Sequence, residues 1–219
     1  QAATRSCSQG GVRNGAATLY YPLWHLEVED LLVLKNNKGT EDNRVRHMDY
    51  GVQFNKLMYE RLMAGGNITL FSPHDVPGLY DAFFADQDEF KRLYEQAERK
   101  TSIRKKVISA TELFSAFMQE RKDTGRIYLQ NVDHANEHSS FKTEVAPIKQ
   151  SNLCCEIDLP TKPLNDINDP NGEIALCTLS AVNWGSFKNP EDMEKACTLA
   201  VRGLDALLSY QNYPIIAAQ

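Results

Sequence analysis

One short segment of the chain, residues 152–156, brings an amide, two thiols and a carboxylate together. If this segment is a strand, successive side chains point to opposite faces, and Asn152, Cys154 and Glu156 share one face. The amide can hydrogen-bond a substrate hydroxyl, and the carboxylate can act as a general base. The thiol can serve as a nucleophile, a redox group or a hydrogen donor. The segment is therefore a candidate active site.

The opposite face of the same predicted strand carries Leu153, Cys155 and Ile157. Two aliphatic side chains and a thiol are typical of a core, where a free cysteine behaves as a small hydrophobe. Cys155 is therefore predicted to pack and Cys154 to react. The alternative is an ordinary strand with a polar outer face, because short motifs match by chance often.

A second candidate is the glycine-rich stretch 8–15, which contains Gly10, Gly11 and Gly15. Glycines permit backbone angles that other residues avoid, so this loop can change conformation at low cost. Gln9 and Arg13 offer donors suited to the edge of a nucleotide base. The alternative is a simple surface turn, and the stretch has neither a Walker pattern nor a GxGxxG fingerprint.

The pair His134 and His138 has the spacing HxxxH beside Asp133. Zinc sites need further ligands at suitable spacing, and none follows, so these residues are predicted to be loop histidines. No metal site is predicted anywhere in the chain.

Hydrophobic periodicity indicates the elements that would position these groups. Strands are predicted at 18–24, 50–54, 68–71, 126–132 and 173–182, with a strand or extended finger at 151–159. Helices are predicted at 28–34, 56–64, 87–98, 106–121 and 190–210. Strands that alternate with helices favour an α/β architecture.

Composition narrows the class of protein. The chain has 219 residues, 42% hydrophobic content and a formal charge of −5, with lysines and arginines spread along it. A nucleic-acid partner needs a clustered basic face, and a membrane span needs a long apolar run, so neither is expected. Five cysteines without a CxxC pair favour reduced thiols and a cytoplasmic location. Because the chain begins at Gln1, we expect a segment of a longer polypeptide.

Four stretches, in order, resemble the large catalytic subunits of class I ribonucleotide reductases. Residues 152–156 resemble the finger-loop motif Asn-x-Cys-x-Glu, and 159–164 resemble the segment that follows it. Residues 173–179 resemble the strand that carries a redox cysteine, here Cys177. A further set of residues resembles the family's substrate and effector specificity loop: Ser8, Gln9, Gly10, Gly11 and Arg13. The chain departs from the family pattern at Asn14, where glycine is usual, and at Cys155, where an aliphatic residue is usual.

The resemblance implies a fold and a set of roles. The fold would be a ten-stranded α/β barrel with a central finger loop, of which residues 1–219 supply part, without the N-terminal cone and the C-terminal half of the barrel. Cys154 would form a thiyl radical that abstracts the 3′ hydrogen of a ribonucleotide. Glu156 would take the proton of the 3′ hydroxyl, and Asn152 would hold the ribose hydroxyls. Cys177 would be half of the dithiol that becomes a disulfide.

The resemblance also implies partners. The segment itself would bind no cofactor, and a small subunit would generate the radical at its metal centre. The large subunit would form a homodimer, reduce nucleoside diphosphates, respond to ATP and deoxynucleotide effectors, and be reset by a thioredoxin- or glutaredoxin-type reductant. Alone, the segment would be inactive. Two alternatives are an anaerobic or cobalamin-dependent reductase and a non-catalytic nucleotide-binding or assembly module.

Overall fold

The computed structural model describes residues 1–219, except for the side chain of Gln9, and divides into two compact units. The first unit comprises Gln1–Pro160 and the second Thr161–Gln219.

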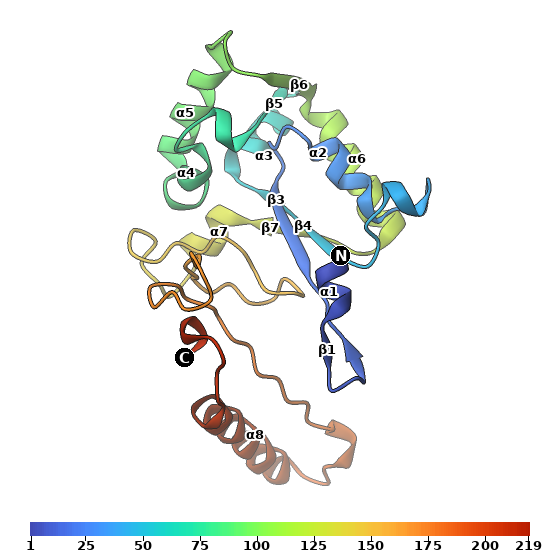
Figure 1. The fold of residues 1–219 in the computed structure, drawn as a ribbon, viewed down its shortest axis with the longest axis vertical. Helices are drawn as coiled ribbons and strands as arrows, with labels where there is room; N and C mark the ends of the chain where they lie inside the picture. The colour runs from blue at the N-terminus through green and yellow to red at the C-terminus, as the bar shows by residue number, and fades with distance from the viewer. The chain divides into compact units, whose positions relative to one another are not determined.

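The first unit is built on a parallel sheet of three strands in the order β3-β4-β7 (Figure 1). These strands are β3 (Thr18–Pro22), β4 (Asp49–Phe54) and β7 (Ile127–Asn131). Parallel neighbours need crossover connections, usually helical, and the chain supplies α2 (Val28–Leu32) between β3 and β4 and longer helical segments between β4 and β7. The predicted α/β class is confirmed, as are the strands expected near 18–24, 50–54 and 126–132.

A second, antiparallel pair joins β5 (Asn67–Phe71) to β6 (Lys105–Ser109). The helix predicted at 106–121 is wrong at its start, because α6 spans Ala110–Thr124 and the residues before it form β6. Ile108 pairs with Ile68 and is buried against it, so sheet pairing overrides the helical spacing here. The Ser109 hydroxyl then accepts a hydrogen bond from the Glu112 N–H and caps the helix.

The remaining helices of this unit, apart from the first, contribute buried side chains to a core rich in aromatic residues. Trp24 is fully buried against Phe83 and Phe90, and such rings contribute much of the apolar area that folding buries. The helices are α1 (Ala2–Ser6), α3 (Lys56–Met63), α4 (Leu79–Ala85), α5 (Gln87–Arg99) and α7 (Val132–Glu137). Of these, α1, α4 and α7 are not among the five predicted helices, because all three are short and do not show a full helical repeat.

The second unit contains the long helix α8 (Pro190–Tyr210), which confirms the prediction at 190–210. Asn189 caps it by accepting a hydrogen bond from the Asp192 N–H, and Pro190 occupies its first turn. The strand predicted at 173–182 is wrong: Glu173 forms an isolated bridge with Lys162, and the residues after Ile174 are irregular. None of the helices in the described residues is long and apolar enough to cross a membrane.

Candidate functional site

The segment with the reactive groups is a closed loop. Ser151 and Asp158 form an isolated antiparallel bridge, and we call residues 151–158 the cysteine loop. Cys155 has a φ of +64°, the left-handed region that a strand does not contain. The Cys155 N–H donates to the Asn152 carbonyl at 3.3 Å, which completes a tight turn. The predicted strand is therefore wrong, although an extended finger was the stated alternative.

Because the loop is not a strand, side chains do not alternate between two faces. Cys154 and Glu156 are exposed, whereas Cys155 is half-buried. Asn152 is half-buried, and its amide oxygen accepts hydrogen bonds from the N–H groups of Glu156 at 3.1 Å and Ile157 at 3.2 Å. The prediction that Asn152, Cys154 and Glu156 share one face was therefore based on the wrong backbone geometry. The loop nevertheless exposes the Cys154 thiol and the Glu156 carboxylate, two residues apart.

Strand β3 holds the first half of the cysteine loop. The Thr18 hydroxyl donates to the Leu153 carbonyl at 2.6 Å, and the Tyr20 hydroxyl donates to the Asn152 carbonyl at 2.7 Å. Burial raises the pKa of Tyr20, and the neighbouring Cys155 thiol raises it further, so the hydroxyl stays protonated and able to donate. Sequence reasoning missed both residues, although their spacing places them on one face of a predicted strand.

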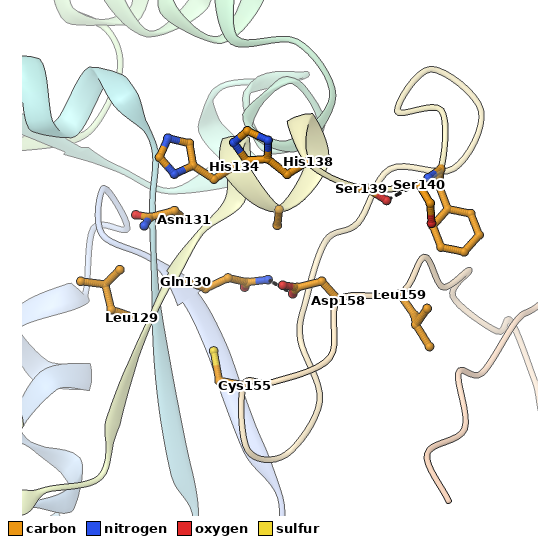
Figure 2. A pocket seen from close by; sticks show the side chains of 12 residues that line it. Leu129, Gln130, Asn131, His134, His138, Ser139, Ser140, Cys155, Asp158 and Leu159 are labelled. Carbon is orange, nitrogen blue, oxygen red and sulfur yellow. Dashed lines mark hydrogen bonds between the residues drawn. The ribbon is translucent and has the colours of Figure 1, made fainter. Parts of the chain in front are cut away.

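Strands β4 and β7 hold the end of the cysteine loop through a chain of amides. The Gln53 amide donates to Gln130 at 2.9 Å and to the Lys149 carbonyl at 2.6 Å. The Gln130 amide in turn donates to the Asp158 carboxylate at 3.1 Å (Figure 2). All three strands of the parallel sheet therefore support the loop, which fixes its position against a rigid element.

A pocket of about 450 Å³ lies beside the cysteine loop. Its walls come from β7, α7, the segment after α7 and the loop itself, with Gln130, His134, Cys155 and Asp158 among them (Figure 2). His134 belongs to α7, so the prediction of a loop histidine is wrong for this residue. His138 lies in a turn after the helix, as its C-cap, so the prediction is confirmed there. Among the described residues, no group of three or more His, Cys, Asp or Glu could hold a metal ion.

The glycine-rich stretch forms a small hairpin of β1 (Ser8–Gln9) and β2 (Arg13–Asn14). Gly10 and Gly11, at its tip, have φ values of +61° and +73°, which only glycine adopts freely. Ser8 and Arg13 are exposed, and the side chain of Gln9 lies outside the described part of the chain. The guanidinium donors of Arg13 therefore face solvent.

The remaining predicted site residue, Cys177, lies in the second unit. Its thiol is free and exposed, in an irregular stretch of chain. Each of the other four cysteines also has a free thiol in the described structure.

Comparison with known proteins identifies what the chain resembles. A model of the ribonucleotide reductase barrel domain matches residues 1–219. The chain is 68% identical to the ribonucleoside-diphosphate reductase subunit alpha of Haemophilus influenzae and 70% identical to ribonucleoside-diphosphate reductase 1 subunit alpha of Escherichia coli, in both cases over its whole length. The corresponding subunit of enterobacteria phage T4 is 58% identical. The chain spans 29% of the length of each of these relatives.

Proposed function

The chain belongs to the ribonucleotide reductase barrel-domain family, and we propose on that basis that it is part of the catalytic barrel of a ribonucleoside-diphosphate reductase alpha subunit. The observation that carries the proposal is the cysteine loop, which combines the family's Asn-x-Cys-x-Glu pattern with an exposed thiol at Cys154. The activity is the reduction of ribonucleotides to deoxyribonucleotides for DNA synthesis.

The first half of the reaction uses the cysteine loop. The Cys154 thiyl radical abstracts the 3′ hydrogen of the ribose, and the Glu156 carboxylate accepts the proton of the 3′ hydroxyl. The 2′ hydroxyl then takes a proton from a thiol of the dithiol and leaves as water. Because the amide oxygen of Asn152 is used inside the loop, its amide nitrogen is the group that donates to a ribose hydroxyl.

The second half of the reaction supplies two electrons. Cys177 and a second cysteine from the rest of the subunit are oxidised from a dithiol to a disulfide, and the substrate carbon is reduced. The 3′ hydrogen returns from Cys154, which regenerates the thiyl radical. Ribonucleotide and dithiol thus become deoxyribonucleotide, disulfide and water. A thioredoxin- or glutaredoxin-type protein restores the dithiol.

Substrate choice depends on the hairpin of Ser8, Gln9, Gly10, Gly11 and Arg13. With glycines at its tip, the hairpin can adopt different conformations when ATP or deoxynucleotide effectors bind, which couples one nucleotide site to another. Asn14 lies in β2 of this hairpin, at a position where the family usually has glycine.

The assembly and location follow from the same family. The relatives are named subunit alpha, which supports a second, small subunit that generates the radical at its own metal centre. The alpha subunit forms a homodimer, acts in the cytoplasm and needs neither nucleic acid nor membrane. Within it, residues 1–219 supply part of a ten-stranded barrel, with β3, β4 and β7 in one half-sheet and the cysteine loop as its central finger. The N-terminal cone and the C-terminal half of the barrel belong to the rest of the subunit.

The test uses the full-length subunit that carries this segment, together with its radical-generating partner and a dithiol reductant. Product formation from a nucleoside diphosphate is measured for the wild type, Cys154→Ser and the matched control Cys197→Ser. We expect Cys154→Ser to lower turnover at least about 1000-fold and Cys197→Ser to retain it. Nucleotide binding without turnover in the wild-type assembly would instead indicate a non-catalytic nucleotide-binding module.

A further inference from the structure

Two hydroxyl groups on β3 contact the cysteine loop directly before its exposed thiol. Thr18 and Tyr20 are two residues apart and therefore lie on the same face of the strand. Their hydroxyls donate to the carbonyls of residues 153 and 152, at 2.6 Å and 2.7 Å. These are the two peptide carbonyls that precede Cys154, so both hydrogen bonds restrain the backbone that carries its thiol.

The position of Tyr20 depends on a glycine in the neighbouring strand. Gly51 of β4 is the register partner of Tyr20. A Cβ atom at position 51 would lie 2.3 Å from Cε1 and 2.4 Å from Cδ1 of the Tyr20 ring, closer than atoms can approach. The ring therefore occupies the space that the missing side chain leaves, and this directs the hydroxyl toward the loop. Because Tyr20 is only 6% exposed, its packing leaves the ring little freedom to turn away.

From this arrangement we infer that Thr18 and Tyr20 are positioning residues, which hold the Cys154 thiol in the position that the reaction needs. Gly51 contributes because its missing side chain leaves space for the Tyr20 ring. The inference rests on the proposed function of Cys154. A displacement of a reacting group by about 1 Å can lower a rate about 100-fold, so two hydrogen bonds this close to the thiol affect the chemical step. Substrate binding elsewhere in the barrel is unaffected.

The first measurement compares kcat and KM in the full-length holoenzyme. Tyr20→Phe and Thr18→Val each lower kcat about tenfold and leave KM for the nucleoside diphosphate unchanged. The matched control is Tyr50→Phe, because the Tyr50 hydroxyl also donates to a backbone carbonyl, that of Val45, at 2.9 Å. This control loses a comparable hydrogen bond away from the loop and keeps its kcat.

A second measurement is independent of turnover. The rate at which iodoacetamide alkylates Cys154 is followed by mass spectrometry, with Cys177 as the internal reference. Tyr20→Phe changes the Cys154 rate at least about threefold, because the backbone that carries this exposed thiol is no longer held in one position, whereas Tyr50→Phe does not. Gly51→Ala displaces the Tyr20 ring and reproduces both effects of Tyr20→Phe. Its control is Gly203→Ala, because a Cβ atom at position 203 would lie in open space.

The inference is overturned if Tyr20→Phe and Thr18→Val keep wild-type kcat and wild-type alkylation of Cys154. It is also overturned if Tyr50→Phe lowers kcat as much as they do, since the effect would then be general destabilisation. The proposed function is judged separately by Cys154→Ser. If that variant keeps turnover, the function fails; if it is inactive while Tyr20→Phe is fully active, only the positioning role fails.

Discussion

The amide oxygen of Asn152 lies 3.1 Å from the backbone nitrogen of Glu156 and accepts its hydrogen bond. The same oxygen accepts the N–H of Ile157 at 3.2 Å. Asn152 therefore closes the cysteine loop around Cys154 in addition to its proposed contact with substrate. Local side-chain acceptors of this kind stabilise turns in preference to regular strands.

Substitutions can separate the two roles of Asn152, which are closing the loop and donating to the substrate. Asn152→Asp keeps an acceptor for the two N–H groups but loses the amide donor proposed for the ribose hydroxyl, whereas Asn152→Ala loses both. We expect Asn152→Asp to lower kcat/KM about 100-fold and Asn152→Ala to lower it further, since a lost hydrogen bond to substrate is worth a few kcal/mol. The rate at which Cys154 is alkylated should change in Asn152→Ala alone. Equal alkylation in both variants would contradict the closing role.

The two adjacent cysteines should differ in their effect on activity. Cys154 is exposed and Cys155 is half-buried with a φ of +64°. In the holoenzyme assay, Cys154→Ala is expected to abolish turnover, and Cys155→Ala to retain at least about a third of it, because small changes at a packing position cost little catalysis. Turnover that survives Cys154→Ala but not Cys155→Ala would show that the wrong thiol was assigned.

The buried amide of Asn136 joins α7 to the segment that leads to the cysteine loop. Its amide nitrogen donates to the carbonyls of Val132 and Ile148, and its oxygen accepts the Ile148 N–H at 2.8 Å. Asn136→Ala leaves the N–H and the carbonyl of the buried Ile148 without these hydrogen-bond partners. The free energy of unfolding should therefore fall by about 2–4 kcal/mol. Urea denaturation measures the loss, with the exposed Asn43→Ala as control. A fall equal to that of the control would contradict this role.

Stability should also depend on pH through His25. Burial lowers the pKa of His25 below its ordinary value of 6.5, against an opposing effect of Glu27, and its Nδ1 accepts the Glu27 N–H at 3.2 Å. A histidine whose folded pKa is lowered stabilises the protein above pH 6.5 and loses that contribution as the pH falls. The drop in Tm between pH 7.5 and 5.5 should therefore be smaller in His25→Gln than in the wild type. The exposed His74→Gln serves as control, and an unchanged drop in His25→Gln would refute the prediction.

Much of the fold was predictable because local pattern and tertiary structure agree. The apolar run before Trp24 became β3, the amphipathic repeat at 87–98 became α5, and the stretch after Asn189 became α8, with Pro190 and acidic residues in its first turn. In each case the element's own sequence contains the capping or periodicity that defines it. The family was likewise predicted from four ordered motifs, and the match over residues 1–219 confirmed it.

Where prediction failed, a distant partner decided the structure. Residues 105–109 became β6 because Ile108 pairs with Ile68 of β5, and helical spacing could not reveal that partner. No strand forms at 173–182, because these residues have no neighbouring strand to pair with continuously. Glu173 pairs only with Lys162, in a single bridge. Strand formation depends on pairing and burial more than on the intrinsic preference of the residues.

The cysteine loop shows the division most clearly. The sequence alone determined which groups are present, their order and their spacing, and hence the chemistry that Asn152, Cys154 and Glu156 can perform. Only the tertiary structure decided how they are held, through the left-handed turn at Cys155 and the hydrogen bonds from Thr18 and Tyr20. Those bonds join residues more than 130 positions apart. Such contacts form when the sheet assembles, so no local pattern within the loop encodes them.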